Sequence, residues 1–213
     1  MVLTAAQRRN SGMIIFSRAI KTWSQIAFDH PREYDLFRGD KDVIITATHA
    51  MPPDSDMFTG ELAAEIAKRS GFTALIGKVS RHEVDLNRKV SDYHPFRKII
   101  CKLIKGSTKR VLIIDLHGKR GSNYIDMGTA NGKSIGKDSL TAFTNAFSLA
   151  NIEFVVDKYF KGSLNGTVIS TFCVPNLVNG IQLELPIELR CNTGKRVLMN
   201  AIDHGVKRFR DET

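Results

Sequence analysis

Short, uninterrupted apolar runs alternate with segments of helical periodicity along this chain, and this alternation constrains the fold more than any other feature. Runs rich in Val, Ile and Leu, of which residues 111–116 are the clearest, are typical of strands buried on both faces. The other predicted strands are 43–48, 72–77, 154–156 and 180–186, and the predicted helices are 59–69, 95–106, 140–149 and 196–209. Strands and helices in alternation predict a three-layer α/β/α sandwich with a mixed, mainly parallel sheet.

The remaining segments predict an extra helix and several loops. Residues 13–28 space their apolar side chains as an amphipathic helix does, and residues 30–31 predict a turn after it. The two prolines within residues 51–56 predict a loop, because proline lacks the N–H that regular pairing needs. Residues 118–136 contain five glycines and predict a long loop, and residues 162–166 predict a tight one. Loops of such length in a compact domain usually carry function.

The bulk properties favour one domain with a small anionic partner. The 213 residues are predicted to form a single domain over 1–213. The net charge of +9 is compatible with nucleic acid, an acidic surface or an anionic small molecule. Because the basic residues are scattered and no nucleic-acid motif occurs, we expect no nucleic acid. No apolar run approaches the ~18 residues of a transmembrane helix, and the oligomeric state stays open.

The cysteines and the first residues bear on the compartment. Cys101, Cys173 and Cys191 have no metal-ligand spacing and cannot all pair with one another, which predicts free thiols in a reducing, cytoplasmic environment. The first 28 residues carry basic but no acidic residues, as organellar presequences do. Arg18 and Lys21 interrupt the apolar stretch, which excludes a secretory signal, and an ordinary amphipathic helix is the favoured interpretation.

Two histidines follow predicted strands, and each has carboxylates nearby in the sequence. His49 precedes Asp54 and Asp56 in the following loop. His117 has Asp115 two residues earlier, on the same side of an extended chain, where it can orient the ring as outer carboxylates do at zinc sites. Two histidines and a carboxylate with an open position describe catalytic zinc, although either histidine alone is more often structural.

A carboxylate and an amide interrupt the last predicted strand. Glu184 and Gln182 are two residues apart and therefore share a face. A buried carboxylate is costly unless it is paired or lies at a cavity mouth, so Glu184 is either the partner of a structural arginine or a general base. Ligands of α/β sheets bind beyond the carboxyl ends of the strands, and we expect His49, Arg81 and His117 to meet there.

A polar segment contains two arginines and an asparagine that suit an anionic substrate. Arg81, Asn87 and Arg88 lie within nine residues of Ser80. Arginine binds a carboxylate through two parallel hydrogen bonds and can also stabilise an oxyanion. The alternative is a solvated loop in which these arginines form ion pairs with the nearby Glu83 and Asp85.

Together these segments resemble motifs of the N-formylglutamate amidohydrolase family, in the same order. The most specific is residues 80–88, SRHEVDLNR, which is similar to the family's SR..vDLNR. The others are THA at 48–50 (PHaG in the family), PDSD at 53–56 (DTDxH), DLHG at 115–118 (DxHS), IDMG at 125–128 (DIxlG), YFKG at 159–162 with Gly166 (PYxGG…G) and IQLEL at 181–185 (iQiEi).

The resemblance implies a zinc-carboxypeptidase/phosphorylase-hydrolase-like fold and a metal-dependent amidohydrolase. Its substrate would be an N-acyl amino acid such as N-formylglutamate, cleaved with the help of one divalent metal ion, zinc before others. The alternatives are a carboxypeptidase-like peptidase or amidase and a non-catalytic protein that binds an anionic ligand.

The same resemblance assigns the residues. His49, Asp56 and His117 become metal ligands, with Asp54 and Glu61 as rivals of Asp56. Glu184 becomes the general base and Arg81 faces the oxyanion. The predicted substrate-binding residues are Asn87, Arg88 and Gln182.

The chain also departs from the family pattern. His49 is followed by Ala-Met instead of Ala-Gly, His117 is followed by Gly instead of Ser, and Lys158 replaces the Pro before Tyr159. These positions concern the pocket walls more than the proposed ligands. The departures therefore bear on the substrate more than on the chemistry.

Overall fold

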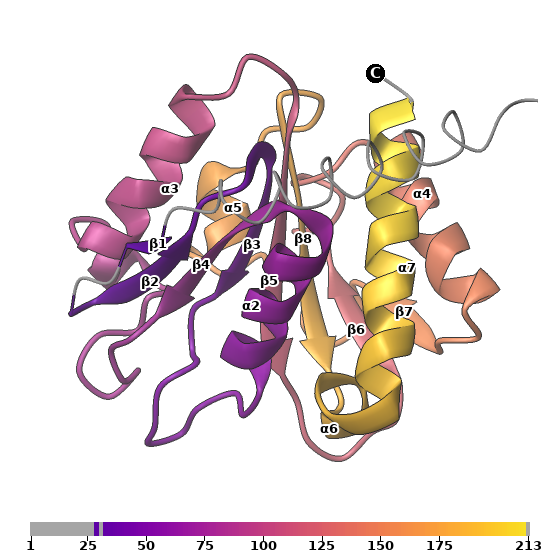
Figure 1. Ribbon diagram of the computed structural model, residues 1–213, viewed down its shortest axis with the longest axis horizontal. Helices are drawn as coiled ribbons and strands as arrows, with labels where there is room; N and C mark the ends of the chain where they lie inside the picture. The colour runs from indigo at the N-terminus through magenta and orange to yellow at the C-terminus, as the bar shows by residue number, and fades with distance from the viewer. Residues whose placement is uncertain (1–27, 30–31, 212–213) are drawn as a thin grey trace, which may run out of the picture.

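The computed structural model describes residues 28–29 and 32–211, in which one sheet lies between two layers of helices (Figure 1). The predicted helix over 13–28 lies outside the described residues apart from Phe28, which belongs to a strand. The predicted turn at 30–31 also lies outside them. The prediction of one domain over 1–213 includes these residues and stays a prediction.

The sheet is mixed and mainly parallel, as predicted. Its eight strands have the order β1-β2-β4-β3-β5-β8-β6-β7. The pairs β3–β4, β3–β5, β5–β8 and β6–β7 are parallel, and β1–β2, β2–β4 and β6–β8 are antiparallel. The strands are β1 Phe28–Asp29, β2 Tyr34–Phe37, β3 Asp40–Ala47, β4 Phe72–Gly77, β5 Val111–Gly118, β6 Ile125–Gly128, β7 Phe154–Val156 and β8 Val178–Leu185.

Helices cover both faces of the sheet, because the side chains of each central strand alternate between two cores. α2 (Thr59–Ser70), α4 (Lys137–Leu149) and α7 (Asn192–Asp211) pack on one face, and α3 (Pro95–Lys105) and α5 (Val168–Phe172) pack on the other. The remaining short helices are η1 (Lys89–Ser91) and α6 (Ile187–Arg190). The three-layer α/β/α prediction is therefore confirmed.

β5 shows how this alternation positions a site. Leu112, Ile114 and Leu116 belong to the first core, which lies between the sheet and α2, α4 and α7. Val111 and Ile113 belong to the second core, which lies between the sheet and α3 and α5. The next two positions on the second face are Asp115 and His117, and both are buried. Polar side chains thus replace the apolar core at the carboxyl end of the strand.

Local signals explain the helix ends. α2 ends before Gly71, whose φ of 71° is a left-handed conformation that glycine adopts without strain. Pro95 is the first residue of α3, where its missing N–H has no partner to lose. His94 caps that helix, since its Nδ1 accepts a hydrogen bond from the Phe96 N–H at 3.2 Å.

The predicted loop over 118–136 is wrong in part, because β6 crosses it. Ile125 and Met127 pack into the first core, and the side chain of Asp126 is on the opposite face of the strand. Asp126 is the register partner of Glu184 in the antiparallel pair of β6 and β8. A strand this short, with a charge at its centre, has no apolar run to reveal it. β1, β2, α5 and α6 were also not predicted, and each is five residues or fewer.

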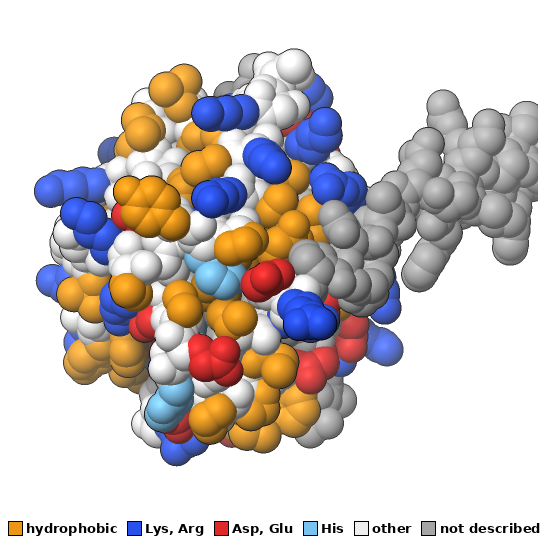
Figure 2. Space-filling view, turned by 90° about the vertical axis from the view of Figure 1, so that its left-hand side faces the viewer, with side chains coloured by type: hydrophobic (Ala, Val, Ile, Leu, Met, Phe, Trp, Pro, Cys, Tyr) orange, Lys and Arg blue, Asp and Glu red, His pale blue; other side chains and the backbone are white. Residues whose placement is uncertain are grey.

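The visible surface does not concentrate the positive charge. On the face shown in Figure 2, Lys and Arg side chains are spread among hydrophobic and acidic ones instead of forming one patch. Among the described residues, no helix is long and apolar enough to cross a membrane.

Candidate functional site

The eight predicted site residues all line one cavity of about 430 Å³. It lies beyond the carboxyl ends of central strands, as expected for an α/β sheet. The residues come from β5, β8 and the loops that follow β3 and β4. They are His49, Asp56, Arg81, Asn87, Arg88, His117, Gln182 and Glu184.

His117 is held by its own strand. Its Nε2 lies 2.8 Å from Oδ2 of Asp115, two residues earlier on the same face of β5. The hydroxyl of Thr46, on neighbouring β3, donates a hydrogen bond to Oδ1 of Asp115 at 2.6 Å. With Nε2 engaged in this way, the Nδ1 of His117 faces Oδ2 of Asp56 at 3.1 Å.

His49 lies just beyond β3 and is held by a different segment. Its Nε2 lies 2.7 Å from Oδ1 of Asp85, in the loop after β4. Its Nδ1 lies 3.5 Å from Oδ2 of Asp56 and is buried without a hydrogen-bond partner among the described residues. The centres of the His49 and His117 rings are 5.0 Å apart. Both rings turn their Nδ1 toward Oδ2 of Asp56.

The loop between β3 and α2 folds back and returns Asp56 to His49. The Asp56 N–H donates to the His49 carbonyl at 2.7 Å, and the Thr59 hydroxyl donates to the Asp56 carbonyl at 2.7 Å. Arg81 Nη2 donates to Oδ1 of Asp56 at 2.7 Å, which leaves Oδ2 to the histidines. Arg81 therefore pairs with Asp56 and not with the acidic residues of its own loop.

The two rivals of Asp56 lie elsewhere. The carboxylate of Asp54 is 69% exposed and lies 2.6 Å from Nε2 of His82. Glu61 is exposed on α2. Of the three candidates, Asp56 is the one grouped with both histidines.

His49, Asp56 and His117 fit a metal ion. One donor atom from each lies within 4.8 Å of the others, close enough to bind one cation. A buried polar atom without a partner costs about 1–3 kcal/mol, and a cation at this point would satisfy Nδ1 of His49. The opposite nitrogen of each ring is engaged by a carboxylate, the arrangement that orients metal-binding histidines. Two imidazoles and one carboxylate with an open position suit zinc.

The charges of this cluster shift its pKa values. Burial alone raises the pKa of Asp56, but the hydrogen bond with His117 and the nearby His49 ring outweigh it and hold that pKa well below 3.8. The same competition, with His49 as partner, sets the pKa of Asp85 at about 2. Burial lowers the pKa of His117, but the Asp115 carboxylate outweighs burial and raises it well above 6.5. A cation that binds both rings must therefore displace a proton from His117.

Glu184 lies beside His117. The two residues are register partners on β8 and β5, and their side chains share one face of the sheet. Gln182 Nε2 donates to Oε1 of Glu184 at 2.8 Å. Burial raises the pKa of Glu184 above its ordinary 4.5, although the nearby His117 opposes the shift. No arginine pairs with Glu184 among the described residues, so the structural-arginine alternative gains no support there.

Arg88 and Asn87 differ in how their side chains are used. Arg88 is 41% exposed, and its Nη1 donates to the Asn87 carbonyl at 2.7 Å. Its Nε lies 3.9 Å from Oδ2 of Asp85, so Arg88 also forms the ion pair that the solvated-loop alternative predicts. Asn87 is buried, with its Oδ1 accepting from the Val168 N–H at 2.7 Å and its Nδ2 lying 3.1 Å from Nε2 of His117. The cavity thus has a partly exposed guanidinium, while the amide of Asn87 is engaged within the protein. A substrate-binding role for Asn87 stays a prediction.

No protein-family model and no curated protein matches the sequence, whereas solved structures do. The N-formylglutamate amidohydrolase from Ralstonia eutropha JMP134 superposes with a TM-score of 0.67 at 14% identity, over 85% of this chain and 97% of that one. A bacteriophage poly-gamma-glutamate hydrolase gives 0.64 at 14%, over 87% and 93%. A putative carboxypeptidase A from Shewanella denitrificans OS-217 gives 0.58 at 14%, over 92% and 69%. The chain has the carboxypeptidase-like fold.

The resemblance read from the sequence motifs is confirmed at the level of this carboxypeptidase-like fold. Identities of 14% establish the fold alone. The activity must therefore be argued from the chemistry of the site.

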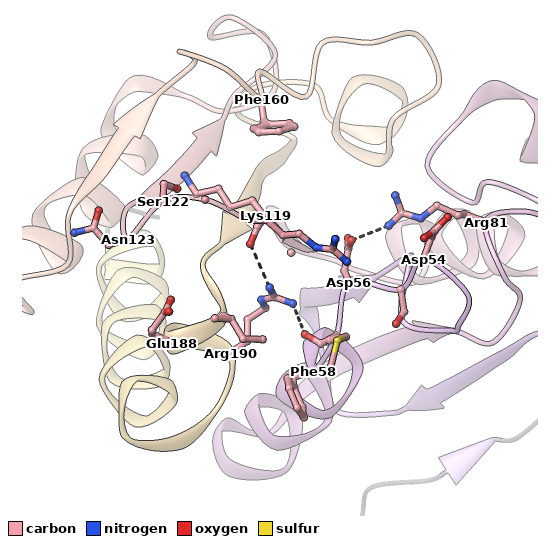
Figure 3. Close-up of a pocket in the computed structure, with 16 residues that line it drawn as sticks. Asp54, Asp56, Phe58, Arg81, Lys119, Ser122, Asn123, Phe160, Glu188 and Arg190 are labelled. Carbon is pink, nitrogen blue, oxygen red and sulfur yellow. Dashed lines mark hydrogen bonds and ion pairs between the residues drawn. The ribbon is translucent and has the colours of Figure 1, made fainter.

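Within the carboxypeptidase-like fold, Arg190 was missed by the sequence analysis. It is buried and donates to the Met57 carbonyl and, at 3.3 Å, to the Lys119 carbonyl (Figure 3). It thereby ties the loop of Asp56 to the end of β5. Gly118 makes this approach possible, since a Cβ there would lie 2.5 Å from Arg190 Nη1 and 3.1 Å from Asp56 Cβ. No local pattern around residue 190 distinguishes it from a surface arginine.

Arg97 was also missed. It is 1% exposed on α3, and its Nη1 donates to the Leu86 carbonyl at 3.2 Å and to the Gly166 carbonyl at 2.7 Å. It therefore holds the loop that carries Asn87 and Arg88 through the backbone of that loop. The amphipathic pattern of α3 gives no sign that this arginine points inward.

Proposed function

We propose that this chain is a metal-dependent amidohydrolase that cleaves the amide bond of an N-acyl amino acid, such as N-formylglutamate. The observation that carries the proposal is the convergence of His49 and His117 on Asp56, with the buried Nδ1 of His49 left without a partner. Glu184 and Arg88 line the same cavity. Metal site, base and anion-binding cation are thus within one pocket.

His49, Asp56 and His117 would hold a divalent ion, zinc before others. When bound there, such an ion lowers the pKa of its water toward ~7 and polarises a carbonyl. Glu184 accepts a proton from the attacking water and later returns it to the leaving nitrogen. Gln182 engages Oε1, and no hydrogen bond from the described residues reaches Oε2, which is therefore the oxygen that receives the proton. The raised pKa of Glu184 suits both steps.

Arg81 stabilises the charge that develops on the carbonyl oxygen. Its guanidinium is fixed by Oδ1 of Asp56 at 2.7 Å, so it lies next to the candidate metal position before substrate arrives. Donors fixed in advance lose little free energy to reorganisation. Removal of one such stabiliser costs roughly 3–4 kcal/mol in the barrier.

Arg88 binds the carboxylate of the amino-acid part. It is the more exposed of the two arginines that line the cavity, at 41% against 32% for Arg81, and an arginine–carboxylate pair can form two parallel hydrogen bonds. The backbone carbonyl of Asn87 accepts a hydrogen bond from Nη1 of Arg88, and the Asn87 side chain is held in turn by the Val168 N–H. A partner of this kind is small and anionic, in agreement with the net charge of +9.

Two other functions are compatible with the fold. A carboxypeptidase-like peptidase would use the same metal, base and arginine. A non-catalytic protein would bind the anionic ligand through Arg88 and need no metal. The predicted cytoplasmic location is part of this proposal and rests on three cysteines that are free in the structure.

The test is turnover and metal content in the Glu184→Gln variant. We expect release of glutamate from N-acyl glutamates to fall below detection while the variant keeps its metal, because Glu184 acts on a proton and is not a ligand. Glu153→Gln is the matched control, since Glu153 is exposed and outside the cavity. Full turnover by Glu184→Gln would show that Glu184 is not the general base. Loss of metal from this variant would show that Glu184 is a metal ligand instead.

A further inference from the structure

A second and larger cavity, of about 890 Å³, adjoins the candidate metal site. It shares Asp56, Arg81, Gly118 and Phe160 with the smaller cavity. In Figure 3, Arg81 and Asp56 lie on one side of it, Ser122, Asn123 and Glu188 lie on the other, and Phe160 lies above. The candidate metal ligand Asp56 therefore stands at the junction of two chambers.

If Arg88 binds the substrate carboxylate as proposed, the two chambers would hold the two parts of the substrate on either side of the scissile bond. Arg88 and Glu184 line the smaller cavity and do not line the larger one. The amine part of the substrate, whose carboxylate Arg88 binds, therefore occupies the smaller cavity. The carbonyl carbon lies at the junction beside Asp56, and whatever the carbonyl carries extends into the larger cavity.

The size of the larger cavity does not suit a formyl group. A formyl carbon bears only hydrogen and would leave this chamber without an occupant. Cavities of roughly 300–1,000 Å³ hold ligands of drug size. A chamber of about 890 Å³ is therefore matched to an acyl group at least as large as an amino-acid residue. Met57, Phe58 and Ile187 supply apolar wall for its aliphatic part.

The charges of the larger cavity leave one cation over. Asp56 pairs with Arg81, and Asp54 pairs with His82. Nζ of Lys119 forms an ion pair with Oδ2 of the buried Asp126 at 2.7 Å, and Glu188 acts electrostatically on Arg190. This leaves Arg120, which is exposed and acts electrostatically on Asp54 but forms neither an ion pair nor a hydrogen bond with any described residue.

We infer that the larger cavity is an acyl-group subsite and that Arg120 selects acyl groups that carry a carboxylate. This inference rests on the proposed function and narrows it. The substrate class becomes an N-acyl amino acid whose acyl part is itself an acidic residue or a chain of them. The bond cleaved is then an amide between two carboxylate-bearing parts, one held by Arg88 and the other by Arg120.

The experiment compares three glutamates in the zinc-loaded full-length chain: N-formyl, N-pentanoyl and N-glutaryl. Pentanoyl and glutaryl have the same chain length and differ by the terminal carboxylate. We expect kcat/KM to rise from formyl to pentanoyl and again to glutaryl. Arg120→Gln should lower the glutaryl-to-pentanoyl ratio about tenfold, the scale of one charge-assisted hydrogen bond. Arg208→Gln, at an exposed arginine of α7 outside both cavities, should leave the ratio unchanged.

A second variant tests size separately from charge. Asn123→Trp narrows the larger cavity from its exposed rim and should lower the pentanoyl-to-formyl ratio. Equal or faster cleavage of the formyl compound by the parent, together with a glutaryl-to-pentanoyl ratio that Arg120→Gln does not change, would overturn the subsite.

Binding separates this inference from the proposed function. The three compounds are titrated calorimetrically into the Glu184→Gln variant, which does not turn them over. If no compound is cleaved by the parent but glutaryl still binds most tightly and depends on Arg120, the hydrolase proposal fails and the subsite stands. Equal affinities for all three would overturn the subsite whatever the turnover.

Discussion

His117 and His49 present the same nitrogen to the same carboxylate, yet each is held by an outer carboxylate in a different way. The pair of His117 with Asp115 is called the His117 arm, and the pair of His49 with Asp85 is called the His49 arm. In the His117 arm, Asp115 lies two residues away in the same strand, fully buried and fixed by Thr46. In the His49 arm, Asp85 lies 36 residues away in a loop, and its side chain is 27% exposed. One arm is part of the sheet, and the other depends on how two loops meet.

This difference has an energetic consequence. Electrostatic interactions strengthen where water is excluded, so the buried Asp115 should act on its histidine more strongly than Asp85 acts on His49. The direct contacts are nevertheless alike, since each ring offers one Nδ1 toward Asp56. The two arms should therefore be equal when a ring is removed and unequal when a carboxylate is changed.

Removal of a ring should have the largest effect. We expect His117→Ala and His49→Ala each to reduce bound zinc from about one equivalent to near none, because each deletes one of three protein ligands. Elemental analysis of protein purified without a metal-affinity tag measures this. His204→Ala, at an exposed position of α7, is the control. A parent protein that takes up no zinc even when it is supplied would contradict the metal site itself.

Changing the outer carboxylates should separate the two arms. Loss of such a partner typically weakens metal binding 10–100-fold. We expect Asp115→Asn to lie near the upper end of that range and Asp85→Asn near the lower end. Competition with a chelator measures zinc affinity, and circular dichroism checks that each variant is folded. Equal losses, or the larger loss for Asp85→Asn, would show that burial does not set the strength of the arms.

The same contrast explains which contacts were predictable. Asp115 and His117 are two residues apart in a predicted strand, and the two-residue period alone places them on one face. The contact between His49 and Asp85 exists only because β3 and β4 lie side by side in parallel. Likewise, the closeness of Glu184 and His117 follows from the register of β5 and β8, which no local pattern reveals.

The motif resemblance supplied what local patterns could not, and it also had a limit. It brought Arg81, Arg88 and Glu184 to one site, and the structure places all three at one cavity. It did not indicate that Arg190 ties the Asp56 loop to the end of β5, nor that Arg97 supports the loop of Arg88. In both cases the contacts that tie the loops are made to backbone carbonyls, and such partners leave no trace in sequence.

The pH dependence of the metal-free chain should show the two arms at opposite ends of the scale. The pKa of His117 is raised in the folded state, so its stabilisation is complete below 6.5 and is lost as the pH rises through the raised value. The pKa of Asp85 is lowered to about 2, so its stabilisation is present above 3.8 and is lost as the pH falls toward 2.

Urea midpoints measured across this pH range without metal test both signs. Asp115→Asn should remove the loss on the alkaline side and leave the acid side in place. Asp85→Asn should reduce the loss on the acid side, to which Asp56 also contributes, and leave the alkaline side in place. A midpoint that rises with pH through the histidine range in the parent protein would contradict the assignment of His117.

The smallest effect should come from Asp54, and it decides the third ligand. Asp54 is exposed and its pair with His82 is of the kind that contributes little, so Asp54→Asn should keep the metal content of the parent. Asp56→Asn should release the metal, because the amide has lost the charge that two imidazoles and Arg81 converge on. If Asp54→Asn released the metal and Asp56→Asn retained it, the loop between β3 and α2 would have to rearrange around the ion. The hydrogen bond from the Asp56 N–H to the His49 carbonyl argues against that rearrangement, since it fixes the loop in the orientation that keeps Asp56 at the histidines.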